Sequence, residues 1–460
     1  MLLEEKRICA ECVSDDCLKN RINSSTTSTQ RCDYCDSLTA TIDMASLARC
    51  CNAVIEGFYE VSSLSDAVVL YGRSPDGKSL SDIISQIGSS WPGANEDIVS
   101  LLTDMWSDLR CYDNQYGEDP WFIEKTKFAE VLSEEWRQME KSLLHEARYI
   151  NPVAAKMLET VFGPVLNDRT NDGNAVVVEV GEGKDIDTLY RARVFQTADA
   201  MEKALGHPER HLGPPSPSIA AAGRMNAKGV SVFYGATHKD IAISEVRPPV
   251  GSHVVVGAFK VIRPLRLLDL HHLGSITLKP DSSVYDPTTA LEASRRDFLG
   301  TLSQRMIMPI MPELQEQDYL TTQAIADFLA THANLNLDGI LFRSSQNSKT
   351  SKSTTGRNAI LFKKASMVLR SEERFGVGTT VDLWYYDESC PKRTLRPEIW
   401  TTPHKEDDQN ALTLREVEPA EPALELDRNS LEIYEIEGVR YEKTAYQVDH
   451  HVSRTKAAVN

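Results

Sequence analysis

Long hydrophobic runs are absent from this sequence of 460 residues. A helix that crosses a bilayer needs roughly 18 or more consecutive apolar residues, and no such run occurs. The first seven residues include Glu4, Glu5, Lys6 and Arg7, where a secretory signal would have an apolar stretch. These absences predict a cytoplasmic protein without a membrane-spanning helix.

Positive charge is also in short supply. The chain has 50 lysines and arginines against 67 aspartates and glutamates, which gives a formal net charge of −17. A surface this acidic argues against general binding to nucleic acids or to anionic membranes. The contents of hydrophobic residues (41%) and charged residues (25%) are ordinary for a globular protein. At about 150 residues per domain, the length predicts roughly three domains.

Cysteines are present but unevenly distributed, and five of the nine lie within the first 35 residues. Cys9 and Cys12 form one CxxC pair, and Cys32 and Cys35 form a second. Because each such pair can direct two thiolates at one tetrahedral ion, we expect these four residues to bind a structural Zn²⁺. Cys17 is a further thiol and an alternative ligand. The competing interpretation is a set of unrelated free cysteines, since a reducing cytosol disfavours disulfides.

Hydrophobic periodicity predicts a helical segment over residues 40–170. Apolar residues recur at steps of three and four in three stretches, which are residues 98–109, 128–143 and 152–166. Asn151 and Pro152 suit the N-cap and the first turn of the last helix.

The hydrophobic pattern of the sequence changes after Gly173. Short β-branched runs predict strands at 175–180, 230–234 and 254–259, and helical patterns return at 290–305 and 321–332. Strands and helices without a regular alternation favour an α+β fold. Residues 371–460 hold 19 acids against 11 bases. Within them, the alternating run 431–436 predicts a strand that forms a β-hairpin with residues 439–441.

Residues 188–270 form a locally basic stretch, with eleven lysines and arginines against six acids. Arg191, Arg224 and Tyr234 lie there, and Glu245 stands in an otherwise apolar run. Arginines bind phosphate oxygens in a bidentate way, a tyrosine ring stacks on a base, and a carboxylate stabilises an oxocarbenium ion. These residues therefore suit a pyrophosphate-bearing substrate. In the competing interpretation they are ordinary surface or core residues, and Glu245 forms a salt bridge with Arg247 along a strand.

Common nucleotide-binding and catalytic motifs are missing. The sequence contains no dinucleotide-binding glycine fingerprint, no P-loop and no HExxH motif. If NAD is handled here, it is not held in the Rossmann manner. Cleavage of an N-glycosidic bond is then expected in preference to hydride transfer.

Several motifs, taken in order, resemble the RES domain family. They are residues 190–191, 223–226, 233–236, 243–248, 267–270, 318–323, 338–344 and 358–362. The resemblance covers about 175–370. It implies a fold related to ADP-ribosyltransferases and diphtheria-toxin-type enzymes, and an activity that cleaves NAD at the nicotinamide bond. Many members are toxins of toxin–antitoxin pairs, and the acceptor is phosphate, water or a protein side chain.

The resemblance also implies roles for individual residues. Arg191 and Arg224 would hold the NAD phosphates, and Tyr234 would line the nicotinamide or ribose pocket. Glu245 would be the catalytic carboxylate, and Ser344 would complete the catalytic set together with Arg191. Arg193 and Ser345 are sequence neighbours that could take the roles of Arg191 and Ser344. A cognate antitoxin or regulatory protein and a homo-oligomer are the partners that we expect.

The N-terminal region resembles the HEPN-like leader of a long subclass of RES proteins. Ribonucleases of the HEPN class carry an arginine and a histidine with four to six residues between them, whereas Arg137 and His145 here have seven residues between them. We therefore expect a docking or regulatory module without ribonuclease activity. The predicted organisation is a zinc knuckle (1–38), a helical leader (39–170), the RES catalytic domain (175–370) and an acidic extension (371–460). Two alternative functions stay open, namely a mono-ADP-ribosyltransferase acting on a protein and a non-catalytic scaffold that senses NAD or ADP-ribose.

Overall fold

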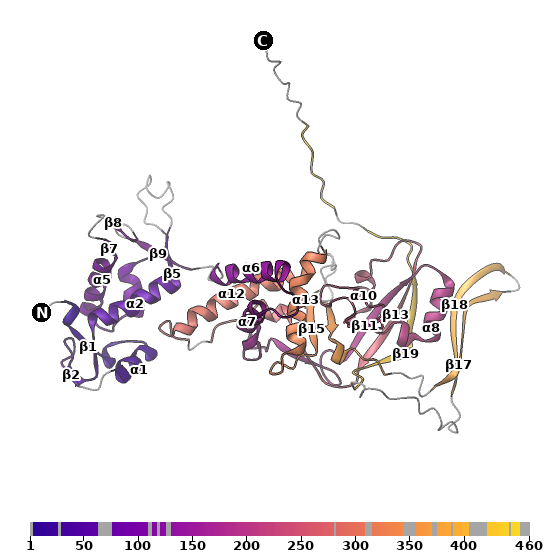
Figure 1. The fold of residues 1–460 in the computed structure, drawn as a ribbon, viewed down its shortest axis with the longest axis horizontal. Coiled ribbons are helices and arrows are strands. Elements are labelled where there is room, and N and C mark those ends of the chain that lie inside the picture. Colours follow the sequence, from indigo (N-terminus) through magenta and orange to yellow (C-terminus); the bar gives the residue numbers. More distant parts are fainter. Residues whose placement is uncertain are drawn as a thin grey trace, which may run out of the picture. The chain divides into compact units, whose positions relative to one another are not determined.

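The structure is a computed structural model of the chain (Figure 1). It describes residues 3–25, 29–62, 76–108, 113–116, 120–125, 130–279, 282–308, 315–343, 356–369, 375–387, 390–403, 421–440 and 443–450. The chain divides into two compact units. Unit 1 comprises residues 1–178, 222–227 and 266–345, and unit 2 comprises residues 179–221, 228–265 and 346–460. Both units contain helices and strands, so the fold is of the mixed type that the sequence predicts.

The N-terminal part of unit 1 is a small lobe of short strands and helices. Its elements are η1 (Leu3–Glu5), β1 (Arg7–Cys9), η2 (Ala10–Cys12), α1 (Asp16–Ser25), β2 (Gln30–Arg31), β3 (Leu38–Thr39), β4 (Thr41–Asp43), α2 (Met44–Phe58), β5 (Tyr59–Val61), β6 (Lys78–Ser79), α4 (Leu80–Ile87), α5 (Pro92–Trp106), β7 (Ser107–Asp108), β8 (Asp113–Asn114) and β9 (Trp121–Glu124). Leu47, Ile83 and Ile98 lie in its continuous hydrophobic core. The region predicted to be helical therefore also carries short strand pairs.

The rest of unit 1 consists mainly of packed helices. They are α6 (Glu130–His145), α7 (Pro152–Phe162), η3 (Gly163–Leu166), α11 (Leu270–Leu273), α12 (Pro287–Ile307) and α13 (Gln315–Thr331). The Asn151 side chain accepts a hydrogen bond from Ala154 N, which confirms the predicted N-cap of α7. Helix α6 packs against α12 and α13 (Figure 1). Strand β15 (Gly339–Arg343) pairs in parallel with β14 (Leu265–Asp269), and β10 (Val177–Val180) neighbours β14 in the strand order.

Unit 2 is built on five strands in the order β16-β12-β11-β13-β19. They are β11 (Thr188–Phe195), β12 (Phe233–Ala236), β13 (His253–Val261), β16 (Arg357–Leu361) and β19 (Leu424–Glu435), accompanied by α8 (Ala198–Gly206), α9 (Pro208–His211), α10 (Lys239–Glu245) and η5 (Lys363–Ala365). The four adjacent pairs are all antiparallel. Figure 1 shows β17 (Phe375–Asp387) and β18 (Cys390–Pro403) as a separate two-stranded ribbon.

Side chains alternate between the two faces of these strands. On one face, Ala192, Ala236 and Val256 pack against Ile241 and Ala242 of α10. On the other face, the rings of Phe233 and Phe259 meet edge to face with their centroids 4.9 Å apart. The predicted site residues of these strands are divided between the two faces.

Two local expectations differ from the structure. Residues 431–435 do form strand as the end of β19, but β19 pairs with β13, and residues 436–440 carry no strand. The predicted hairpin with residues 439–441 is therefore wrong, because β13 offers the run a much longer partner. Residues 241–245 belong to helix α10, whereas the competing salt-bridge interpretation assumed a strand there, since a short apolar run fits a buried helix as well as a strand. Among the described residues, no helix combines the length and apolarity that a membrane span requires.

Candidate functional site

The four cysteines of the two CxxC pairs meet in one cluster. Cys9 precedes the single turn η2 and Cys12 ends it, whereas Cys32 and Cys35 lie in the turn between β2 and β3. Their sulfur atoms all lie within 4.8 Å of one another. Asp36 closes the second turn, with φ of 63° and a backbone N–H that donates to Cys32 O at 3.0 Å.

The distances between sulfur atoms suit a tetrahedral metal ion. They are 3.6 Å for Cys9–Cys12, 3.5 Å for Cys9–Cys35 and 3.9 Å for Cys12–Cys32. Zinc–sulfur bonds of about 2.3 Å at tetrahedral angles place the sulfur atoms about 3.8 Å apart. Cys9, Cys12 and Cys32 are also part of the hydrophobic core of the lobe. The cluster could hold one metal ion, and four thiolate ligands would leave no position for a substrate.

The surroundings of Cys9, Cys12 and Cys35 shift the pKa of each of these thiols. Burial is the main cause that raises the pKa of Cys9 and of Cys12 above the ordinary thiol value. Hydrogen bonds with the side chain and backbone of Ser37 lower the pKa of Cys35 to about 6. A bound cation would compensate the charge of the buried thiolates, because metal binding displaces thiol protons. Cys17, on α1, lies outside this group of four sulfur atoms.

Glu245 is the last residue of α10, and its side chain is exposed. One carboxylate oxygen accepts a hydrogen bond of 2.6 Å from Nδ2 of Asn358 on β16, and Asn358 is only 4% exposed. The strand that the competing salt-bridge interpretation assumed is therefore absent here. Arg247 follows the helix with φ of 45°, so strand alternation does not place it beside Glu245. The Glu245 carboxyl group is thus held at the surface by a buried amide.

Tyr234 lies on the same face of the strands as α10. Its cross-strand partner is Ile360, and Ala236, two residues further, pairs with Asn358. Because alternate residues share a face, Tyr234, Ala236 and Asn358 point to the side on which α10 packs. Tyr234 is 36% exposed, so part of its ring is accessible to a ligand.

Arg191 lies on the opposite face. Its guanidinium carbon stands 5.1 Å from the centroid of the Phe233 ring, and its cross-strand partner is Gly257. Among the described residues, its Nη1 is buried and has no hydrogen-bond partner. Burial, assisted by the charge of Arg193, lowers the pKa of Arg191 to about 10. The strand register thus brings Tyr234 and Glu245 to one face and Arg191 to the other.

Arg224 belongs to a tight turn of unit 1, in which Gly223 N donates to Asn226 O at 2.9 Å. Its Nη1 donates to Met306 O at 2.7 Å and its Nη2 donates to Met308 O at 2.6 Å. The two carbonyls lie at the C-terminal end of α12, where backbone acceptors have no partner within the helix. In this structure Arg224 thus binds a helix end, and phosphate binding by Arg224 stays a prediction.

The remaining predicted residues are placed as follows. Ser344 and Ser345 lie outside the described residues. Arg193 is exposed, and its Nη1 donates to the backbone oxygen of His211. Arg137 and His145 both lie on α6, and Arg137 forms an ion pair with Glu134 one turn earlier.

Sequence reasoning missed Asn358 as a site residue. It begins the run 358–362, in which the four remaining residues are all apolar. A lone amide that opens a buried strand needs a hydrogen-bond partner, and that requirement was the available signal. The identity of the partner depends on a residue 113 positions away.

The comparisons with known proteins give one match. Residues 188–385 match the family model of the RES domain. No curated protein and no solved structure matches the chain.

Proposed function

Because residues 188–385 are a RES domain, we propose that the chain degrades NAD by cleaving its nicotinamide–ribose bond. The observation that carries this proposal is the exposed Glu245 carboxylate, oriented by the buried Asn358 amide on the face that also presents Tyr234. In the cell we expect such an enzyme to act as a toxin or defence effector under the control of a cognate partner.

The proposed reaction starts from the C1′–N1 bond of NAD. The bond breaks with its electron pair leaving on nicotinamide, and positive charge develops on the ribose as an oxocarbenium ion. Phosphate or water then adds to C1′ and loses a proton. The negative charge of Glu245 would stabilise the developing cation, since a fixed charge aimed at the reacting centre lowers the barrier.

Two neighbours would support Glu245. The amide of Asn358 donates a hydrogen bond to the carboxylate, which fixes the position of the carboxylate. The partly exposed ring of Tyr234 offers a flat surface on which the nicotinamide or the ribose can pack.

One incubation distinguishes this proposal from its alternatives. Purified full-length protein is mixed with NAD, with and without inorganic phosphate, and nicotinamide release is followed. Release that requires phosphate indicates a phosphorylase, and release without phosphate indicates a glycohydrolase. ADP-ribose attached to a protein indicates a transferase. Absence of nicotinamide release in every condition would contradict the proposal and favour a sensing scaffold.

For the N-terminal lobe, we propose that Cys9, Cys12, Cys32 and Cys35 hold one structural Zn²⁺. The proposal is supported by the four convergent sulfur atoms and by their burial in the core of the lobe. Zinc is the expected ion, because a tetrahedral set of four thiolates is typical of zinc sites.

A further inference from the structure

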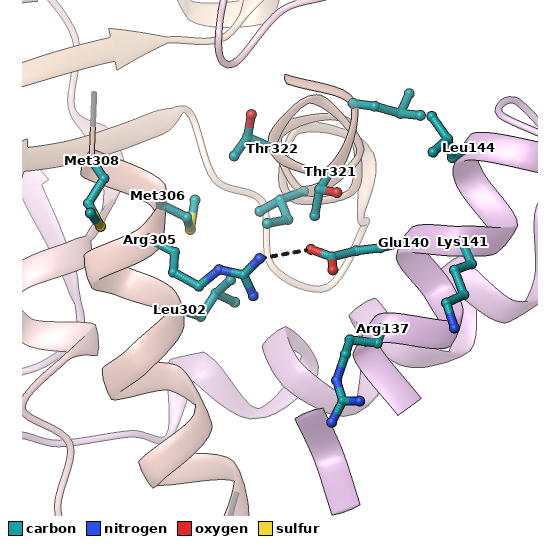
Figure 2. A pocket seen from close by; sticks show the side chains of 12 residues that line it. Arg137, Glu140, Lys141, Leu144, Leu302, Arg305, Met306, Met308, Thr321 and Thr322 are labelled. Atoms are coloured by element: carbon teal, nitrogen blue, oxygen red, sulfur yellow. Dashed lines mark hydrogen bonds and ion pairs between the residues drawn. The ribbon is translucent and has the colours of Figure 1, made fainter. Parts of the chain in front are cut away.

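A pocket of about 460 Å³ opens between three helices of unit 1, α6, α12 and α13 (Figure 2). Its volume falls within the range of roughly 300–1,000 Å³ that is typical of small-molecule sites. None of the residues that line it belongs to the proposed catalytic set. Six of them are apolar, namely Leu144, Leu302, Met306, Met308, Leu320 and Ile325.

The apolar residues form a buried floor and an exposed rim. Ile325, Met306 and Leu302 are almost fully buried, whereas Met308 is 59% exposed. Leu144 also reaches the surface, on the α6 side. Such a gradient suits a ligand with an apolar body that enters the floor and a polar end that stays near the opening.

The charges around the opening are mainly positive. Arg137 and Lys141 come from α6 and Arg305 comes from α12, and Glu140 is the one acid in the lining, while Arg137 also pairs with Glu134 outside the lining. Figure 2 shows Arg305 and Glu140 pointing toward one another, with an ion pair of 3.3 Å between them. Helix α13 contributes the neutral Thr321 and Thr322. The net positive charge favours an anionic end group on the ligand.

The wall of the pocket is tied to the turn that contains Arg224. The guanidinium of Arg224 binds the backbone oxygens of Met306 and Met308. From α13, Thr322 Oγ1 donates to Arg224 O at 2.5 Å, and Gln323 Nε2 donates to Gly223 O at 2.8 Å. A ligand that orders the end of α12 would therefore also order this turn.

We propose that this pocket binds a small amphipathic organic anion, in which an apolar body carries a carboxylate, sulfonate or phosphate group. The apolar body packs on Leu302, Met306 and Ile325, and the anion lies beside Arg305 and Lys141. Occupation stabilises the turn of residues 222–227 through the hydrogen bonds of Arg224. The inference concerns binding alone and does not depend on NAD cleavage.

The test uses two fluorescent probes and full-length protein. Anilinonaphthalene sulfonate has an apolar body and a negative charge, and phenylnaphthylamine has nearly the same body without the charge. The wild type should bind the sulfonate more tightly than the neutral probe. Arg305→Gln and Lys141→Glu should each weaken sulfonate binding about tenfold, because hydrogen bonds and ion pairs to a charged group are lost. In both variants the affinity for the neutral probe should stay within about twofold of the wild-type affinity.

Lys156→Glu is the matched control, since Lys156 is exposed on the neighbouring helix α7 and does not line the pocket. It carries the same charge change as Lys141→Glu and should bind both probes like the wild type. Equal sulfonate affinity in Lys141→Glu, Arg305→Gln and the wild type would overturn the site. An equal loss in the control would overturn it too, since the effect would then be one of net charge.

Hydrogen exchange provides the second measurement. Saturating sulfonate probe should slow amide exchange in residues 222–227 of the wild type, where Gly223 and Asn226 exchange backbone hydrogen bonds. Unchanged exchange at a saturated pocket would overturn the link to Arg224. Neither readout uses NAD, so failure of this proposal is distinguishable from failure of the proposed enzymatic function.

Discussion

A hydrogen bond from Asn358 to Glu245 joins the two residues on which the proposed chemistry of unit 2 depends. The Asn358 amide is buried and the Glu245 carboxyl group is exposed, so the hydrogen bond anchors a surface carboxyl group to the interior of unit 2. Hydrogen bonds to charged groups typically contribute about 1.5–3 kcal/mol, which makes the pair sensitive to small changes.

Asn358→Asp should expose this dependence. The substitution keeps the size of the side chain but replaces the donor with a carboxylate oxygen facing Glu245. Like charges repel, so nicotinamide release should fall at least tenfold at pH 8. It should recover partly at lower pH, because a proton shared between the two carboxyl groups restores a donor. A variant whose activity follows the wild-type pH profile throughout would show that Asn358 does not position Glu245.

Arg191 allows two interpretations that one pair of variants separates. If its Nη1, which has no hydrogen-bond partner in the described part of the chain, is an anion-binding group, Arg191→Ala should weaken NAD binding strongly, and Arg191→Lys should restore it only in part. If the guanidinium only packs on Phe233, Arg191→Ala should lower the melting temperature and leave NAD affinity unchanged. Isothermal titration and thermal melting on the same samples decide between the two outcomes.

At the scale of elements, sequence patterns were sufficient where the signal was long or local. Helix α7 begins at Pro152 after the Asn151 cap, as expected, because a cap depends on neighbouring residues only. Residues 241–246 contain only four apolar positions, too few to distinguish the strand assumed in the salt-bridge interpretation from the short helix that forms. Because these residues form a helix, Glu245 is the last residue of α10, and its side chain is exposed. The partner of β19 could not be read from its own residues, because β13 lies far away along the chain.

The cysteine pairs were predictable for the same reason, since each CxxC spacing is local. Cys9→Ser should abolish stoichiometric zinc binding and lower the melting temperature of the N-terminal lobe, because three of the four cysteines in the cluster are also core residues. Cys17→Ser should retain about one zinc per chain. Metal analysis of the purified proteins measures both. A wild type without zinc, whose four thiols are freely titratable under native conditions, would refute the site.

At the scale of the whole molecule, the RES match of residues 188–385 includes segments of both compact units. The motifs of the family could be recognised from the sequence because they are short and ordered. Their three-dimensional arrangement could not, since it depends on strand register and on which face each side chain occupies. Arg191 and Glu245 illustrate this limit: strand register puts Arg191 on one face, and Glu245 lies on α10, which packs on the other face.

The most direct test of the central claim compares nicotinamide release by three full-length proteins. Glu245→Gln keeps the shape of the side chain and removes its charge, and Asp240→Asn makes the same change at an exposed position of the same helix. We predict that Glu245→Gln releases nicotinamide about 10²–10³ times more slowly, with normal folding and retained NAD binding. Asp240→Asn should match the wild type. A folded Glu245→Gln protein that turns over NAD at the wild-type rate would contradict the account.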